Sequence, residues 1–329
     1  MATAQQLKAL IESYTERNPD RFLAVASQIA AHAARTGKEK LALELRQLVD
    51  EARRSQRTHS PQAQSVPIAQ PTGELTGLVA ASLPKTRLSD MVLETTLEHR
   101  LRRVVVEYRQ VDRLQSHGLA PRRRLLLLGP PGCGKSMTAA ALAGELHLPL
   151  LTVQFHTLIT KFMGETAAKL RLIFDSMNQS RGVYLFDEFD AIGAHRYGSH
   201  DVGEIRRVLN SFLIFLEQDD SMSVIIAATN LEGSLDEALF RRFDDALRYG
   251  LPSPAMARRL IENRFGSFDI QRLGWKSILQ AAKGMTHSDI VKACEDAAKD
   301  AVLDERRQVR TGELRQAITQ RRRFAGEPG

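Results

Sequence analysis

The stretch from Leu125 to Thr138 reads LLLLGPPGCGKSMT, and it limits the possible folds more than any other part of the chain. Four consecutive leucines before a glycine-rich turn predict a short strand that is buried on both faces. The turn and the Lys-Ser pair after it fit the spacing G-x-x-x-x-G-K-S/T, and the alanine-rich run beyond predicts a helix. A strand, a glycine-rich loop and a helix in this order predict a phosphate-binding loop within an α/β fold.

This loop is expected to hold the phosphates of a nucleotide. Glycine adds no side chain, so backbone N–H groups can point inward around phosphate oxygens, and the following helix presents its positive N-terminus to the same anion. Lys135 would reach the β- and γ-phosphates, and the Ser136 hydroxyl would ligate Mg²⁺. A Gly/Pro turn that happens to precede a lysine is the alternative, but both flanks that the motif requires are present. The residues assigned to the nucleotide are Pro131, Gly132, Cys133, Gly134, Lys135, Ser136 and Met137.

Length and cysteine usage set the broad class of protein. At 329 residues the chain suits two or three domains rather than one small core. The two cysteines, Cys133 and Cys294, provide no disulfide framework and indicate a reduced setting. No stretch approaches the apolar length of a membrane span, and the N-terminus lacks a signal pattern. We therefore expect a cytoplasmic protein with no membrane partner.

The net charge of +7 is unevenly placed, because arginines crowd the approach to the loop and recur near the end of the chain. Such runs can bind nucleic acid, form solvated helix faces, or line a nucleotide-binding subunit interface. No aromatic stacking pattern accompanies the charge, so nucleic acid is the less favoured partner.

The chain before the loop divides into two segments. Residues 1–54 show three short amphipathic patterns and no cluster of catalytic residue types, which predicts a three-helix bundle that serves as an adaptor or oligomer contact. Residues 55–84 are rich in Pro, Gly, Ser and Gln and predict a flexible linker. A helix is then expected over residues 90–116.

Strand and helix patterns alternate after the loop. Strands are expected at residues 150–153, 182–186, 224–229 and 246–249, with helices at 167–177 and 202–217. This alternation predicts a parallel sheet with helices on both faces, over residues 85–250. From residue 251 to 329 the pattern is helical throughout, and it predicts a separate helical lid with segments at 255–265, 275–283, 288–307 and 312–324.

Two carboxylates follow the apolar strand that ends at Phe186. A strand that ends in Asp187 and Glu188 places them at the carboxyl edge of the sheet, where the phosphate loop also lies. Asp187 suits Mg²⁺ coordination, since this ion takes oxygen ligands and keeps part of its hydration shell. Glu188 is expected to orient and polarise the attacking water, because phosphoryl transfer depends on positioning and charge stabilisation.

Polar side chains also follow the next strand and precede the last one. Asn230, after the run AAT, would hold the γ-phosphate or the lytic water, although asparagine also suits a cap or turn. Arg241 and Arg242 come just before the last expected strand. Guanidinium groups stabilise the charge that develops on a transferring phosphoryl group, so both are candidate catalytic residues.

Together these segments resemble an AAA-type ATPase module from about Lys85 to the end of the chain. The matching pieces are GPPGCGKS as Walker A, VYLFDE as Walker B, AATN as sensor 1, ALFRRFD as the arginine-finger region, and GMTHSDI as a lid signature that normally reads G-x-S-x-A-D-I. The resemblance implies ATP and Mg²⁺ as ligands and a homo-oligomeric ring, usually a hexamer, with ATP at each interface. Arg241 and Arg242 would then serve the neighbouring subunit. Many relatives carry R-x-G-R-F at this point, so the pair leaves open which arginine is the finger.

The stretch TLITKFMGET is similar to the central-pore loop of that family. Phe162 would face the pore between Lys161 and Met163 and grip an extended polypeptide by packing, because aromatic rings contact many sequences without needing defined hydrogen bonds. The alternative is that Phe162 and Met163 belong to the core. The neighbouring Lys161 and Gly164 favour a loop.

Three functions remain open from the sequence. The first is an ATP-driven ring that remodels, unfolds or regulates a protein partner selected by the N-terminal bundle. The second is a nucleic-acid-handling ATPase of the helicase-loader or transposition-regulator type, which would use the arginine runs. The third is a regulatory switch whose ring controls an effector such as a protease.

Substitution of the pore aromatic separates threading from the other functions. Phe162→Ala should leave basal ATP hydrolysis largely intact and abolish substrate-stimulated work, because the lost ring contacts the polypeptide and not the nucleotide. Phosphate release with and without a protein substrate measures both quantities. Unchanged remodelling by the variant would reject threading.

Overall fold

The computed structural model describes residues 77–153, 163–189, 202–230 and 237–324, together with Leu75 and Leu158. All of them belong to one of the two compact units of the chain, Ile68–Gly329. The predicted three-helix bundle of residues 1–54, most of the predicted linker, and Lys161 and Phe162 of the predicted pore loop lie outside the described residues. No helix in the described part of the chain has both the length and the apolar character needed for a membrane span.

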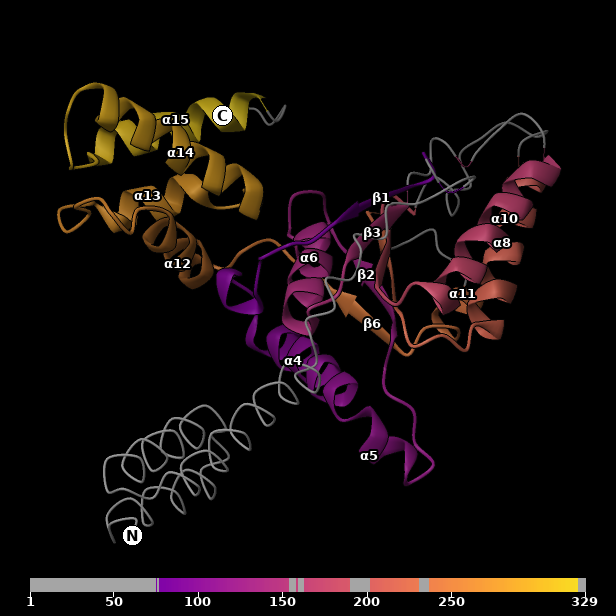
Figure 1. Ribbon diagram of the computed structural model, residues 1–329. Helices are drawn as coiled ribbons and strands as arrows, with labels where there is room; N and C mark the ends of the chain where they lie inside the picture. The colour runs from indigo at the N-terminus through magenta and orange to yellow at the C-terminus, as the bar shows by residue number, and fades with distance from the viewer. Residues whose placement is uncertain are drawn as a thin grey trace, which may run out of the picture. The chain divides into compact units, whose positions relative to one another are not determined.

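A six-stranded sheet forms the centre of this unit, in the order β1-β3-β4-β5-β2-β6 (Figure 1). The strands are β1 Val79–Ser82, β2 Arg124–Leu128, β3 Leu150–Val153, β4 Val183–Phe186, β5 Val224–Thr229 and β6 Asp245–Arg248. Strands β2 to β6 pair in parallel, and the registers align Leu128 with Thr229 of β5 and Arg248 of β6. The predicted α/β fold is therefore confirmed, and β2 to β6 form the predicted parallel sheet.

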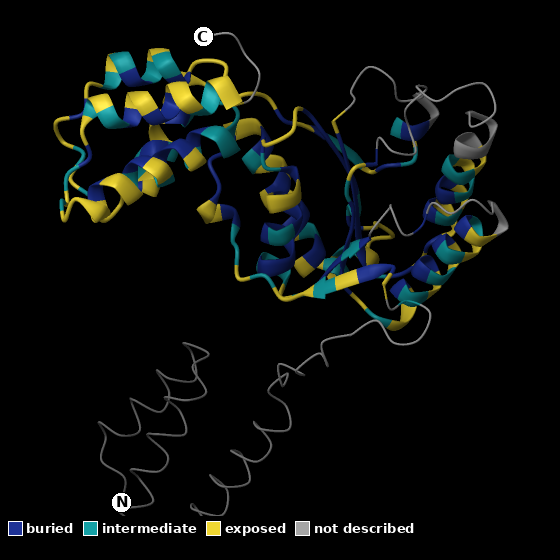
Figure 2. Ribbon diagram, turned by 90° about the horizontal axis from the view of Figure 1, so that it is seen from above, coloured by how far each residue is buried: buried dark blue, intermediate teal, exposed yellow. Residues whose placement is uncertain are grey.

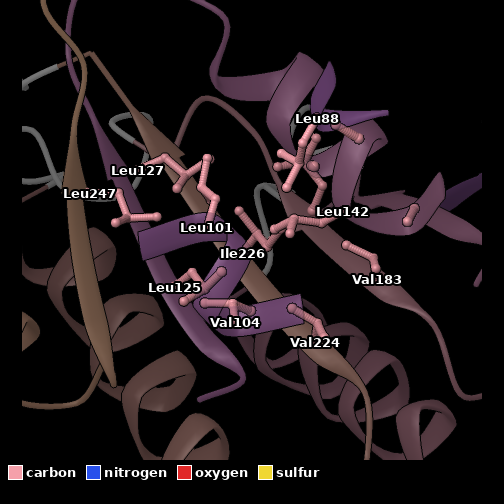
Figure 3. Close-up of a cluster of buried hydrophobic side chains, with 14 of the residues drawn as sticks. Leu88, Leu101, Val104, Leu125, Leu127, Leu142, Val183, Val224, Ile226 and Leu247 are labelled. Atoms are coloured by element: carbon pink, nitrogen blue, oxygen red, sulfur yellow. The ribbon is translucent and has the colours of Figure 1, made fainter. Parts of the chain in front are cut away.

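Helices cover both faces of the sheet because the strand residues alternate between two cores. On one face, Leu126 and Leu128 of β2 pack in a cluster with residues of α8 (Met163–Gln179) and α10 (Val202–Gln218). On the other, Leu125 and Leu127 pack with residues of α4 (Thr95–Arg109) and α6 (Lys135–Leu146), as Figure 3 shows. All four leucines are fully buried, which is why β2 lies inside the sheet and not at its edge.

The lid consists of four helices with a hydrophobic cluster of their own. They are α12 Pro254–Arg264, α13 Trp275–Ala282, α14 His287–Leu303 and α15 Thr311–Phe324. Two begin at side-chain caps: Ser253 Oγ accepts a bond from the Met256 N–H (3.3 Å), and Thr286 Oγ1 accepts one from the Asp289 N–H (3.2 Å). In Figure 2 the buried residues of these helices face one another, and the exposed ones face outward.

Two sequence predictions were wrong in detail. The predicted linker of residues 55–84 contains strand β1, which pairs antiparallel with β3 at the sheet edge, so the sheet is mixed and not wholly parallel. The helix predicted over residues 90–116 begins only at Thr95 and is interrupted at Gln110, where α5 (Val111–Gln115) follows. The residues from Met91 to Leu93 lie outside any helix and are buried instead, and they line the cavity described below.

The arginines ahead of the phosphate loop are largely matched by carboxylates. On α4, Arg102 pairs with Glu98 (2.8 Å) and Arg103 with Glu107 (2.9 Å), and both are i,i+4 pairs along the helix. The remaining pairs are Arg87–Glu145, Arg100–Asp245, Arg109–Glu145, Arg122–Glu107, Arg122–Asp245 and Arg123–Asp219. This pairing reduces the positive field that a nucleic acid would need.

A close contact between α6 and the preceding chain generates a stability prediction. A Cβ on Gly144 would overlap the Thr86 carbonyl oxygen, and the Arg87 guanidinium donates to the Gly144 carbonyl (2.6 Å). Gly144→Ala should lower the free energy of unfolding by about 1–3 kcal/mol through overpacking, although alanine is the better helix former. Urea denaturation followed by circular dichroism measures the change.

Gly312, in the first turn of α15, is the matched control because a Cβ there would meet nothing within 4 Å. Gly312→Ala should be neutral or add up to about 1 kcal/mol of stability. Equal effects of the two substitutions would contradict the packing argument.

Candidate nucleotide site

The phosphate loop is a backbone structure that only glycine permits at its key positions. Gly129 has a φ of 146°, and a Cβ there would overlap the Tyr249 carbonyl oxygen. Gly134 has a φ of 98° and forms the N-cap of α6, so the first turn of that helix opens directly from the loop. The Gly129 N–H donates to the Thr229 carbonyl (3.3 Å), which fixes the loop at the carboxyl end of β5.

Lys135 and Asn230 meet at this edge of the sheet. The Lys135 side chain is only 6% exposed, and its Nζ donates to the carbonyls of Gly129 (2.7 Å) and Pro130 (2.9 Å). It also donates to Asn230 Oδ1 at 2.8 Å. The ammonium group is thus held by oxygen atoms of the loop backbone and of Asn230.

Ser136 and Asp187 form the second contact of the site. The Ser136 hydroxyl donates to Asp187 Oδ2 at 2.5 Å, and the other carboxylate oxygen accepts from the Glu188 N–H (2.9 Å). Glu188 is exposed and has a φ of 53°, which is uncommon for a residue other than glycine. Its neighbour Phe189 is fully buried and donates its N–H to the Ala228 carbonyl (2.8 Å), so the chain beyond β4 is anchored.

The two candidate arginines differ in their surroundings. Arg242 forms an ion pair with Glu217 near the end of α10, whereas Arg241 is exposed and makes no ion pair with any described residue. Both follow α11 (Glu237–Phe240), and neither lines the cavity that contains Lys135 and Asp187. The structure therefore separates the arginines from the other predicted site residues.

A cavity of about 650 Å³ lies between the phosphate loop and the lid. It is lined by the whole run from Pro131 to Met137 and by Asp187, Glu188 and Asn230, so the sequence predicted one wall of it. The other wall was not predicted. It comes from the segment before α4 and from the lid, and consists of Asp90, Met91, Val92, Leu93, Leu260, Asn263, Arg264, His287, Ser288 and Val291.

The lid reaches the phosphate loop directly at the start of α14. The Ser288 N–H donates to the Gly132 carbonyl at 3.0 Å. Gly132 has a φ of 74°, and a Cβ there would press against the Thr286 and Ser288 side chains. The GMTHSDI signature identified this turn in the sequence as part of the lid, but it did not predict the contact with the phosphate loop. The apolar run from Met91 to Leu93 carried no comparable signal, because it reads as part of a helix.

Burial determines the protonation of two groups beside the cavity. Burial raises the pKa of the Cys133 thiol, so this loop residue stays a protonated space-filling group at neutral pH. Burial lowers the pKa of the His287 imidazole, so the ring is neutral there. Within the described residues, no group of three or more His, Cys, Asp or Glu side chains gathers as a protein-only metal site.

A parallel sheet with this loop at its carboxyl edge, a buried lysine in the loop, and a serine bonded to a strand-end aspartate define a P-loop nucleoside triphosphatase. The family described as "ATPase family associated with various cellular activities (AAA)" matches residues 125–251. The chain is 35% identical over 332 residues to an uncharacterized AAA family ATPase, y4kL, of Sinorhizobium fredii, covering 99% of this chain and 98% of that protein. The chain belongs to the AAA family and is an ATPase.

Two further relatives match a shorter part of the chain. One is the nuclear valosin-containing protein-like protein of Mus musculus, 31% identical over 210 residues, which cover 61% of this chain and 24% of that protein. The other is the proteasome-activating nucleotidase of Methanococcus maripaludis, 30% identical over 209 residues, which cover 61% of this chain and 51% of that protein. The matches thus cover between about a quarter and a half of these two proteins.

Proposed function

We propose that this ATPase works as a homo-oligomeric ring, with six subunits, and that ATP hydrolysis in the ring remodels or regulates a protein partner. The proposal rests on the position of a charged side chain relative to the cavity. The cavity contains Lys135, Asp187, Glu188 and Asn230, but Arg241 lies outside it. A site of this kind is complete when a second copy supplies the guanidinium group.

Mg²⁺ fits the donors at the end of β4. Ser136 Oγ and Asp187 Oδ2 lie 2.5 Å apart and are oxygen ligands of the kind that this ion takes. We propose that these two residues hold it, Asp187 through water. When bound, the ion would neutralise negative charge on the phosphate oxygens.

The chain's own residues have separate roles in the proposed hydrolysis. The loop backbone from Pro131 to Ser136 binds the phosphates, and Lys135 exchanges its carbonyl partners for β- and γ-phosphate oxygens. Glu188 orients the attacking water and accepts its proton, for which its exposed position beside Asp187 is suited. Asn230, already bonded to Lys135, holds the γ-phosphate or that water in line.

The exposed arginine is the better candidate for the finger. Arg242 is engaged with Glu217 of its own subunit, so it is suited to fixing the chain between α11 and β6. Arg241 precedes it and is available to a neighbouring copy. We therefore assign charge stabilisation in the neighbour's site to Arg241, with Arg242 as the positioning residue beside it.

A protein partner is favoured over nucleic acid for two reasons. Most of the arginines ahead of the loop are matched by carboxylates, as described above. One relative is named as a proteasome-activating nucleotidase. Residues 1–54 would select the partner and Phe162 would grip it in the pore. The buried, unpaired Cys133 and Cys294 are compatible with a reduced, cytoplasmic setting.

The first test removes the proposed base. Glu188→Gln should retain ATP binding and lower turnover at least about 100-fold, because the amide cannot accept the proton from water. ATP binding, phosphate release and ring mass by light scattering give the three readouts, and the ATP-bound variant is then the bait for capturing the protein partner. Normal turnover by the variant would refute the role of Glu188.

The second test asks whether two subunits build each site. Arg241→Ala and Glu188→Gln should each abolish hydrolysis alone, whereas a mixture should regain activity at up to about a quarter of interfaces, where intact halves meet. Arg242→Ala mixed with Glu188→Gln shows whether activity is regained with this arginine variant instead, which would make Arg242 the finger. Absence of rescue for both arginines, or full activity of an isolated subunit, would contradict the shared site.

A further inference from the structure

The cavity lining is of two chemical kinds. The loop backbone and Lys135 suit phosphates, whereas Met91, Val92, Leu93, Leu260 and Val291 make part of the lining apolar. A nucleotide has the same polarity, with a charged phosphate chain and a flat, weakly polar base. In such cavities a small number of polar groups among apolar ones fix the orientation of a ligand and decide its identity.

His287 is one of the polar residues in the cavity lining, and its backbone position is fixed on both sides. It is the first residue of α14. The preceding Thr286 is the cap of that helix, and the following Ser288 donates its N–H to the Gly132 carbonyl (3.0 Å). The imidazole therefore projects from a backbone that is bonded to the phosphate loop, and only rotation of the side chain can reorient it.

Neither ring nitrogen of His287 is satisfied. Both nitrogens are buried and have no hydrogen-bond partner among the described residues. The Val92 backbone lies close enough to favour the protonated ring, but the contact falls short of ordinary hydrogen-bond geometry, and burial lowers the pKa overall. A neutral imidazole offers one donor and one acceptor, and buried polar groups without a partner are rare because they cost stability.

We propose that His287 hydrogen-bonds the nucleoside part of the bound nucleotide and makes the site selective among nucleotides. A rotation of the side chain brings a ring nitrogen from its contact near Val92 to the base or the sugar. This role rests on the proposed binding of ATP in the cavity. The phosphates have donors of their own in the loop backbone and Lys135, so the proposal assigns His287 to the nucleoside.

The test measures dissociation constants by calorimetry for ADP, IDP, 7-deaza-ADP and 2′-deoxy-ADP, so that no hydrolysis or subunit contact is needed. His287→Ala should weaken ADP binding by about five- to tenfold, the effect of one lost hydrogen bond. One analogue, the one that lacks the group facing His287, should bind the wild type and the variant equally. Equal binding by the wild type and the variant that is confined to IDP or 7-deaza-ADP assigns the base, and equal binding confined to 2′-deoxy-ADP assigns the sugar.

Three controls keep the outcomes distinct. His287→Gln retains a donor and an acceptor and should bind ADP more tightly than His287→Ala. His99→Ala removes an exposed histidine on α4, away from the cavity lining, and should leave all four constants unchanged. Lys135→Ala should weaken the binding of all four ligands alike.

Two outcomes would overturn the role of His287: unchanged binding by His287→Ala, or the same loss of affinity for every ligand. A wild type that binds no nucleotide would instead overturn the proposed function itself.

Discussion

The site depends on the burial of four leucines. Leu125 to Leu128 have no exposed surface, so β2 must lie inside a sheet covered on both faces. Because β4 and β5 run parallel to β2, their carboxyl ends reach the edge where the phosphate loop emerges. Asp187 then meets Ser136 across 51 residues of chain, and Asn230 meets Lys135 across 95. Burial of the apolar residues of β2 thus brings the polar residues of the nucleotide site together.

The charges at this edge explain why one copy of the chain is an incomplete catalyst in our proposal. Hydrolysis of a triphosphate concentrates negative charge on the transferring group, and a guanidinium group is well suited to stabilise it. Within the described residues, the arginine that lines the cavity is Arg264, which pairs with Glu295. Arg241 is exposed elsewhere on the subunit, which makes charge stabilisation dependent on assembly.

The lid is joined to the site by backbone atoms and not by side chains alone. The Ser288 N–H bonds the Gly132 carbonyl, and Gly132 leaves no room for a Cβ between them. His287 lies in the first turn of α14, so the residue that we expect to contact the nucleoside is joined to the loop through its neighbour Ser288.

The sequence by itself determined the α/β class, the phosphate loop and the wall of the cavity from Pro131 to Asn230, because buried strands and loop glycines have strong local patterns. It also predicted the lid helices to within a few residues, since their apolar spacing is local as well.

Only the tertiary structure decided the rest. Strand β1 is too short and small-sided to be seen without its partner β3, and Met91 and Leu93 lie outside the helix and pack in the same hydrophobic cluster as residues of α6. The different surroundings of the adjacent Arg241 and Arg242 likewise depend on the tertiary structure. Arg242 pairs with Glu217, which lies far from both arginines in the sequence.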